Sequence, residues 1–291
     1  MAKGIRELKG RIRGVTNIAK ITRAMEMVAT TKLKRMQDRA EGARPYSECL
    51  RAMVGRLADQ VSADEFPLLK KRPDGKIGLL AVTADKGLCG AYNSNMFKEI
   101  GTFTKDGAGA GREVELFMFG ARGGIFYKHR EPNLGAAYAD GMEKIPFVRV
   151  RDVVRDIAQK FVDGELSELH IASTRFVSQA RQVPETRQLL PIDADALLGE
   201  GADVGGDFIF EPSVEAIFER LLPKYLEVQV YGAILEALAS EMAMKRAAMK
   251  AATDAANDMI GGLTRQYNRA RQEGITNELL EIIGGAEALT A

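Results

Sequence analysis

Apolar residues recur at intervals of three and four along the first part of the chain, which is the spacing of one face of an α-helix. The series comprises Ile5, Leu8, Ile12 and Val15, then, after a step of three, Ile18, Ile21, Met25 and Val28, and finally Leu33 and Met36. It predicts one helix over residues 4–60, about 80 Å long at a rise of about 1.5 Å per residue. Pro45 lies inside this stretch, so we expect a kink or a break just before it.

A stricter apolar series runs through the last part of the chain. Steps of three and four give thirteen positions, eleven of them apolar: Val228, Tyr231, Leu235, Leu238, Met242, Lys245, Met249, Ala252, Ala256, Met259, Leu263, Gln266 and Ala270. The series spans about six heptads, more than the three or four that indicate a coiled coil. We expect the two long helices to pair with each other, antiparallel. The alternative is a bundle completed by further helices, but the middle of the chain is not typical of helix.

Short apolar runs alternate with helical stretches between the two long segments. Strands are expected over residues 77–83, 113–119 and 168–174, helices over 91–103 and 151–162, and glycine-rich loops over 106–111 and 199–207. This alternation predicts an α/β fold with a parallel or mixed sheet covered by helices. The chain would then comprise an N-terminal helix over 1–60, a central α/β domain over 70–210 and a C-terminal helix over 211–291.

Composition and charge narrow the possible partners. Of 291 residues, 46% are hydrophobic, and no run approaches the roughly 18–20 apolar residues of a membrane span. The start does not resemble a signal peptide, and Cys49 and Cys89 are expected to be reduced thiols. The net charge is +1, but residues 1–39 hold eleven Lys and Arg against three acidic residues, which leaves +8 there and −7 elsewhere. This asymmetry indicates an acidic partner, whether nucleic acid, anionic lipid or a protein loop.

No motif in the chain indicates an enzyme. There is no Gly-x-x-x-x-Gly-Lys-Ser/Thr phosphate loop, and residues 120–124 follow a strand but lack the spacing of a dinucleotide fingerprint. His129 and His170 lack a neighbouring pattern of metal ligands. We therefore expect no catalytic residue, no cofactor and no metal, with the sheet as a scaffold. DNA binding is disfavoured because the basic helix has no interleaved aromatic residues.

Three stretches together point to a family. Residues 275–286 are ITNELLEIIGGA, residues 20–29 are KITRAMEMVA, and residues 85–90 are DKGLCG. In this order they resemble the gamma subunit of F-type ATP synthase, and the resemblance extends from about residue 3 to residue 288. It implies a long antiparallel coiled coil formed by the N- and C-terminal segments, with a Rossmann-like α/β domain at its foot. The subunit would be the non-catalytic central rotor shaft, which couples rotation of the membrane c ring to conformational change in the catalytic beta subunits.

The resemblance also implies partners, and residues that contact them. Partners would be the alpha and beta subunits, the epsilon subunit and the c-subunit ring, with no nucleic acid and with the membrane reached only through partner subunits. The location would be the cytoplasmic face of a bacterial inner membrane. The residues that match the family's alpha and beta contacts are Met25, Lys86, Cys89, Arg271, Gln272, Thr276 and Glu278. Those that match the foot facing the c ring and epsilon are Phe208, Phe210 and Glu211, although Phe210 stands where the family often has Tyr.

The residues alone are also compatible with two further classes of protein. A coiled-coil adaptor or nucleic-acid-binding protein with an α/β ligand domain is the main alternative, and an α/β enzyme with helical extensions is the other. Residues 85–90 could be a tight turn that needs two glycines. The basic face of the first helix could simply be solvated.

Overall fold

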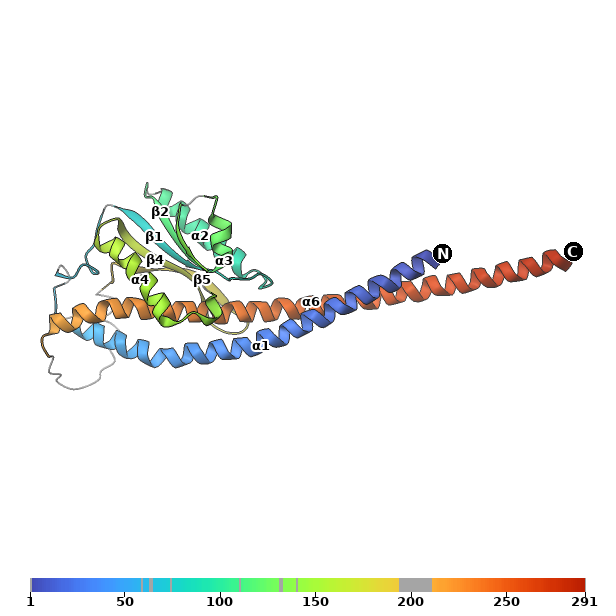
Figure 1. The fold of residues 1–291 in the computed structure, drawn as a ribbon, viewed down its shortest axis with the longest axis horizontal. Helices are drawn as coiled ribbons and strands as arrows, with labels where there is room; N and C mark the ends of the chain where they lie inside the picture. Colours follow the sequence, from blue (N-terminus) through green and yellow to red (C-terminus); the bar gives the residue numbers. More distant parts are fainter. Residues whose placement is uncertain are drawn as a thin grey trace. The chain divides into compact units, whose positions relative to one another are not determined.

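The structure is a computed structural model that describes residues 2–58, 60–62, 65–73, 75–109, 111–130, 133–139, 141–193 and 211–290. Its elements are α1 (Ala2–Ala58), β1 (Lys76–Val82), α2 (Tyr92–Gly109), β2 (Val114–Phe119), α3 (Ala121–Tyr127), β3 (Asn133–Tyr138), η2 (Met142–Lys144), α4 (Phe147–Val162), β4 (Leu166–Phe176), β5 (Gln182–Leu190) and α6 (Val214–Thr290) (Figure 1). The predicted α/β fold with a long helix at each end is confirmed.

The chain divides into two compact units. One consists of Met1–Thr30 and Lys245–Ala291, and we call it the helical-pair unit. The other, Thr31–Met244, contains the sheet and is called the sheet unit. Helices α1 and α6 each contribute residues to both units. No described helix combines the length and the hydropathy needed to cross a membrane.

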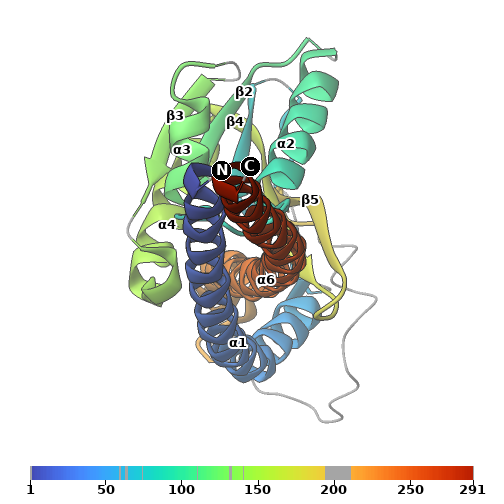
Figure 2. The same cartoon turned by 90° about the vertical axis from the view of Figure 1, so that its right-hand side faces the viewer.

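The sheet has five strands in the order β3-β2-β1-β4-β5, with β3 at one edge and β5 at the other (Figure 2). β1 pairs in parallel with β2 and β4, β2 pairs in parallel with β3, and only β5 is antiparallel. The edge strands β3 and β5 were not predicted. Their sequences, NLGAAY and QVPETRQLL, lack a continuous apolar run because each strand has one unpaired side and a half-exposed surface.

Both faces of the sheet are covered, which explains why β1 and β2 are buried at nearly every position and are mostly apolar. On β1, Leu79 faces a core formed with α2 and α3, whereas Leu80 faces a core formed with α4, α1 and α6. Figures 1 and 2 show α4 on one side of the sheet and α2 and α3 on the other. The larger core contains Leu33 and Met36 of α1 and Leu238 of α6, so these parts of the long helices belong to the hydrophobic core of the sheet unit.

Two predicted breaks are not present. Helix α1 continues through Pro45, although proline removes one backbone donor. Residues on both sides of Pro45, including Met36, Leu50 and Val54, are buried in the core, and this packing stabilises the helix across the missing hydrogen bond. Helix α2 runs to Gly109, so the expected loop over residues 106–111 is helical over its first four residues.

In the helical-pair unit the two helices run in opposite directions. Thr22 Oγ1 lies 2.8 Å from Thr253 Oγ1, and a Cβ at Gly274 would lie 3.6 Å from Ile5 Cδ1. Contacts therefore move towards the end of α6 as they move towards the start of α1. This confirms the predicted antiparallel pairing.

The predicted contact face of α1 is wrong between residues 18 and 28. Ile18, Ile21 and Val28 are 54%, 59% and 54% exposed, whereas Ala19 and Ala29 are 8% and 1% exposed. The face of α1 that packs on α6 therefore carries small residues. We call this face, which includes Ala19 and Ala29, the seam. The prediction followed the largest apolar side chains, but small side chains allow the two backbones to approach more closely.

The predicted face of α6 is nearly correct. In the helical-pair unit Met249, Ala256 and Leu263 are buried at 5–7% exposure, together with Thr253 at 4%. Met259, which is 54% exposed, and Gln266, which is also exposed, are the exceptions. Small residues of α1 thus pack against a face of α6 that holds both large and small residues, and both helices keep some large apolar residues exposed.

The corrected seam predicts opposite results at two adjacent residues. Val28→Gln replaces an exposed side chain and should change the free energy of unfolding by no more than about 0.5 kcal/mol. Ala29→Gln forces a long polar side chain into a closely packed seam and should cost about 1–3 kcal/mol. Urea unfolding of the isolated chain, followed by circular dichroism, measures both. A larger loss of unfolding free energy for Val28→Gln than for Ala29→Gln would show that the contact face predicted from the large apolar residues is correct.

Candidate partner-contact sites

The loop Asp85–Gly90 follows β1 at the carboxyl end of the parallel strands, where α/β folds place their contact residues. Lys86 is exposed, and the side chain of Leu88 is 62% exposed. Leu88 also has φ 63°, the left-handed conformation that a non-glycine residue adopts at a cost of about 1–2 kcal/mol. An exposed apolar side chain on a strained backbone indicates that the loop is shaped for a contact.

The inner side of this loop is fixed by buried groups. Cys89 is 2% exposed, and its sulfur accepts a hydrogen bond from Asn93 Nδ2 at 3.4 Å. Asn93 Oδ1 in turn accepts from the Ala84 amide at 3.0 Å. Burial raises the pKa of Tyr92 well above its ordinary value, and the nearby Glu241 carboxylate raises it further. Cys89 therefore holds the loop in place, while Lys86 and Leu88 form its exposed surface.

Asp85 ties the loop to two other segments. Its Oδ1 accepts from the Ala121 amide at 3.1 Å, and its Oδ2 accepts from the Met142 amide at 2.7 Å. Ala121 is the first residue of α3, so the chain's own carboxylate occupies the helix start that phosphate groups occupy in nucleotide-binding α/β proteins. Gly120 serves close packing, because a Cβ there would lie 2.1 Å from the Thr83 carbonyl oxygen. The glycines at 120–124 thus have structural roles.

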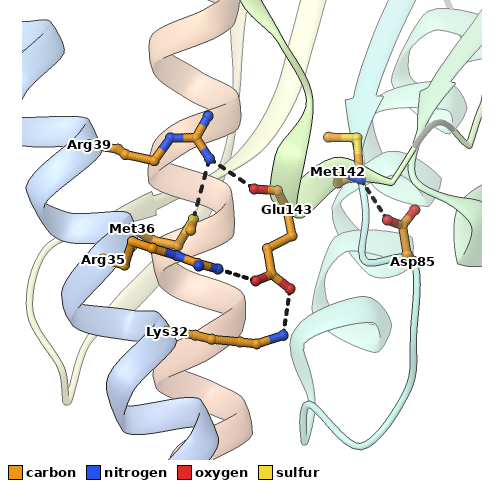
Figure 3. A network of polar contacts seen from close by, with 7 residues as sticks. All are labelled: Lys32, Arg35, Met36, Arg39, Asp85, Met142 and Glu143. Atoms are coloured by element: carbon orange, nitrogen blue, oxygen red, sulfur yellow. Dashed lines mark hydrogen bonds and ion pairs between the residues drawn. The ribbon is translucent and has the colours of Figure 1, made fainter.

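Glu143, immediately after Met142, is bound by α1 (Figure 3). Its carboxylate accepts a hydrogen bond from Lys32 Nζ at 2.6 Å and another from Arg35 Nη2. Its carbonyl oxygen accepts from Arg39 Nη1 at 2.8 Å, and Arg39 Nη2 donates to the Tyr231 hydroxyl at 3.1 Å. The sequence did not indicate this cluster, because Glu143 lies more than a hundred residues from its partners.

The charge of this cluster persists at neutral pH. Burial works to raise the pKa of Glu143, but the hydrogen bonds and charges of Lys32 and Arg35 outweigh it, so the pKa is lowered from its ordinary value. A lowered folded-state pKa means that the ion pairs contribute stability above the unfolded-state pKa and lose it as the pH falls through the folded-state value. Part of the basic charge of α1 is therefore neutralised within the chain.

The end of α6 has a different character. Arg271, Gln272, Thr276 and Glu278 are all exposed, so each is available to a partner. Large apolar residues alternate with them and are 50–68% exposed: Ile275, Leu279, Leu280, Ile282 and Ile283. Figure 1 shows that this end of α6 extends past the first residues of α1. These residues form a broad exposed apolar face, and such a face marks a surface suited to contact with other chains.

A second apolar surface lies on α1, beside the seam. It consists of Ile18, Ile21 and Val28, with the half-buried Met25 near its centre. The exposed cations Lys20 and Arg23 lie on the same turns of the helix, outside this surface. The combination fits a partner that is apolar and acidic, as the charge of residues 1–39 indicated.

The predicted site residues fall into separate places. Lys86 and Cys89 share one loop of the sheet unit, whereas Met25 and the Arg271–Glu278 group belong to the helical-pair unit. Glu211 is exposed, and Phe208 and Phe210 lie outside the described residues. Across the described part of the chain, no group of three or more His, Cys, Asp and Glu is placed to hold a metal ion.

Comparison with known proteins gives matches over nearly the whole chain. A family model described as ATP synthase matches residues 4–289. An ATP synthase gamma chain from Moorella thermoacetica is 40% identical over 285 residues, covering 98% of this chain and 99% of that one. An ATP synthase gamma chain from Dehalococcoides mccartyi is 41% identical over 287 residues with the same coverage.

Solved structures share the fold. A chain in the Euglena gracilis mitochondrial ATP synthase, OSCP/F1/c-ring in rotational state 3, has a TM-score of 0.70 at 20% identity, covering 99% of this chain and 95% of that chain. A chain in the central stalk and c-ring structure of the Tetrahymena thermophila mitochondrial ATP synthase has a TM-score of 0.61 at 24% identity, covering 80% of this chain and 99% of that chain.

The two bonds to Asp85 predict that this residue stabilises the sheet unit. Asp85→Ala leaves the Ala121 and Met142 amides without their acceptor and should lower the free energy of unfolding by about 1–3 kcal/mol. Asp85→Asn keeps one oxygen acceptor and should cost less. Lys86→Ala, on the same loop but exposed, is the matched control, with a change within about 0.5 kcal/mol. Equal urea midpoints for the two alanine variants would show that the Asp85 hydrogen bonds contribute nothing.

Proposed function

Because the chain belongs to the gamma-chain family of ATP synthase, we propose that it is the central rotor shaft of a proton-translocating F-type ATP synthase. In this role it couples rotation of the c ring to conformational change in the catalytic beta subunits, for ATP synthesis or hydrolysis. It is a subunit of the ATP synthase complex and not an enzyme in its own right. The observation that carries the proposal is the match to gamma chains at 40–41% identity over 98% of the chain.

The end of α6 is the proposed contact with the alpha and beta subunits. Its exposed apolar residues would lie against a surrounding collar of subunits, and Arg271, Gln272, Thr276 and Glu278 would form polar contacts with the beta subunits. Exposed apolar area would be buried on assembly at a gain of about 25 cal/mol per Å². Polar contacts can form in one rotary state and release in the next, which a rotating subunit requires.

The apolar surface of α1 around Met25 is the proposed contact with an acidic loop of the beta subunits. Lys20 and Arg23, which are exposed on the same turns of α1, supply positive charge near this surface. In the sheet unit, the loop that presents Lys86 and Leu88 is proposed as a further contact, with Cys89 acting from inside by fixing the loop.

The foot of the subunit is proposed to contain Phe208, Phe210 and Glu211 and to contact the c ring and the epsilon subunit. The membrane would then be reached through these partners. The proposed location is the cytoplasmic face of a bacterial inner membrane, where the subunit is peripheral.

Rotor contacts at the end of α6 should affect turnover and not the stability of the chain. Arg271 and Glu278 are exposed, so changing both to Ala should leave the melting temperature of the isolated chain nearly unchanged. In the complex reconstituted with alpha and beta subunits, the same variant should slow ATP hydrolysis, because charge-assisted contacts with a partner are lost.

The matched control changes Arg269 and Glu273, which form an exposed ion pair at 2.9 Å on the same helix, both to Ala. This control should melt and turn over normally. Equal slowing by both double variants would show a general effect of charge on the helix. If the unmodified chain does not co-elute with alpha and beta subunits in size-exclusion chromatography, the rotor proposal itself is wrong.

Met25→Lys should impair coupling more than assembly. A new ammonium at the centre of the apolar surface would pair with an acidic beta loop, and a charge-assisted bond of about 1.5–3 kcal/mol is enough to trap one rotary state. Reconstituted vesicles should hydrolyse ATP but pump fewer protons per ATP. Thr30→Lys adds the same charge about 140° around the helix and should couple normally. If Met25→Lys leaves the ratio of protons pumped to ATP hydrolysed unchanged, Met25 is not part of the proposed contact.

A further inference from the structure

We propose that Asp85 and Glu143 form a brace that fixes the loop Asp85–Gly90 to residues 32–39 of α1, so that the loop and the helix turn as one body under load. The contacts that form the brace do not depend on the protein's function. Its role in transmitting load rests on the rotor function proposed above. Met142 and Glu143, which are consecutive in the chain, connect the loop at one end of the brace to α1 at the other. The amide of Met142 is bound by Asp85, and the carboxylate and carbonyl of Glu143 are bound by α1 (Figure 3).

The segment between the two ends is held rigidly. Met142 and Ile145 are each 1% exposed, so the short helix η2 is anchored in the core on both sides of Glu143. Gly141 precedes it at φ 79°, a left-handed turn that favours glycine. The backbone of η2 therefore cannot shift without disturbing the core, and a force applied to the loop at Asp85 reaches Glu143.

The contacts on α1 are directional, and this distinguishes them from the core packing around them. Lys32, Arg35 and Arg39 are spaced three and four residues apart, so they lie on one face of the helix over two turns. Hydrophobic burial has no preferred direction, so the core by itself does not single out one rotational position of a helix as sharply as directional bonds do. Hydrogen bonds lose strength when their geometry changes, so three of them converging on one residue fix the rotational position of α1.

The brace also extends to the second long helix. Arg39 Nη2 donates to the hydroxyl of Tyr231 on α6 while Arg39 Nη1 donates to Glu143. One arginine thus joins α1, η2 and α6 within the sheet unit. If the subunit is a rotor, torque on the sheet unit enters both helices through this residue as well as through the core.

The ion pairs are half-exposed and should contribute little to unfolding stability. The side chains of Lys32 and Arg35 are 36% and 55% exposed, and exposed pairs are worth little in stability. If Glu143 acts as a brace, its loss should change hydrogen exchange and coupling more than the melting temperature. If its ion pairs serve only stability, its loss should lower the melting temperature and leave coupling unchanged.

The first experiment uses the isolated full-length chain and does not depend on the rotor function. Hydrogen exchange is measured on peptides that cover residues 84–92 and 30–40, in unmodified protein and in Glu143→Gln. The variant keeps the size of the side chain but removes its charge. We expect faster exchange in both peptides with little change in melting temperature. Unchanged exchange in the loop peptide would overturn the brace.

The matched control is Glu185→Gln. It removes the Arg175–Glu185 pair at 2.8 Å, which has similar exposure and lies on β4 and β5 of the same unit but outside the brace. This control should leave exchange in both peptides unchanged. Equal loosening by the two variants would show a general loss of stability and would also overturn the brace.

The second experiment measures coupling in the complete complex in vesicles. Glu143→Gln should assemble and hydrolyse ATP, with protons pumped per ATP falling roughly twofold or more, the size expected for a residue that transmits coupling. A short bismaleimide joining Lys32→Cys to Glu143→Cys, with the exposed Cys49 replaced by Ser, should restore coupling. Failure of the cross-link to rescue, or normal coupling without Glu143, would refute the brace. If unmodified protein fails to couple, the rotor function fails, and the exchange experiment still decides the brace.

Discussion

Burial of both faces of one five-stranded sheet is the constraint on which the sheet unit depends. The central strands β1 and β2 are mostly apolar and are buried at nearly every position, so both faces must be kept from water. Helices α2 and α3 cover one face, but α4 alone does not complete the other core. Residues of α1 and α6, such as Leu33 and Leu238, complete it. The long helices are therefore part of the domain core and not appendages to it.

Hydrophobic burial has no preferred direction, and the polar contacts add a directional constraint on the angular position of a helix. Asp85 binds amides from two segments, and Glu143 binds three side chains of α1. These groups are partly exposed at the border of the core. Partial burial strengthens their hydrogen bonds, and partial exposure avoids a large desolvation cost. The half-exposed Glu143 ion pairs contribute to geometry more than to the free energy of unfolding, whereas the Asp85 hydrogen bonds contribute to both.

The helical-pair unit divides its apolar side chains between two tasks. Small residues such as Ala19 and Ala29 form the seam with α6, whereas the larger Ile18, Ile21 and Val28 stay outside. A pair of helices that used its largest residues for itself would leave little apolar surface for other subunits. The observed division leaves large apolar residues exposed for contact with other subunits, as the proposed function requires.

The sequence by itself determined the two long helices, α2, α4 and the central strands, because their periodicity and composition are local properties, but it did not indicate the short helices α3 and η2. It also placed the loop Asp85–Gly90 at the carboxyl end of a strand. The tertiary structure decided which face of α1 packs on α6, because close approach of two backbones favours small side chains over the large ones that dominate a hydrophobic pattern. It decided the edge strands, whose pairing on one side leaves no continuous apolar run. It also decided the partners of Glu143, because an ion pair between residues more than a hundred positions apart depends on the fold that brings them together, and no local pattern records it.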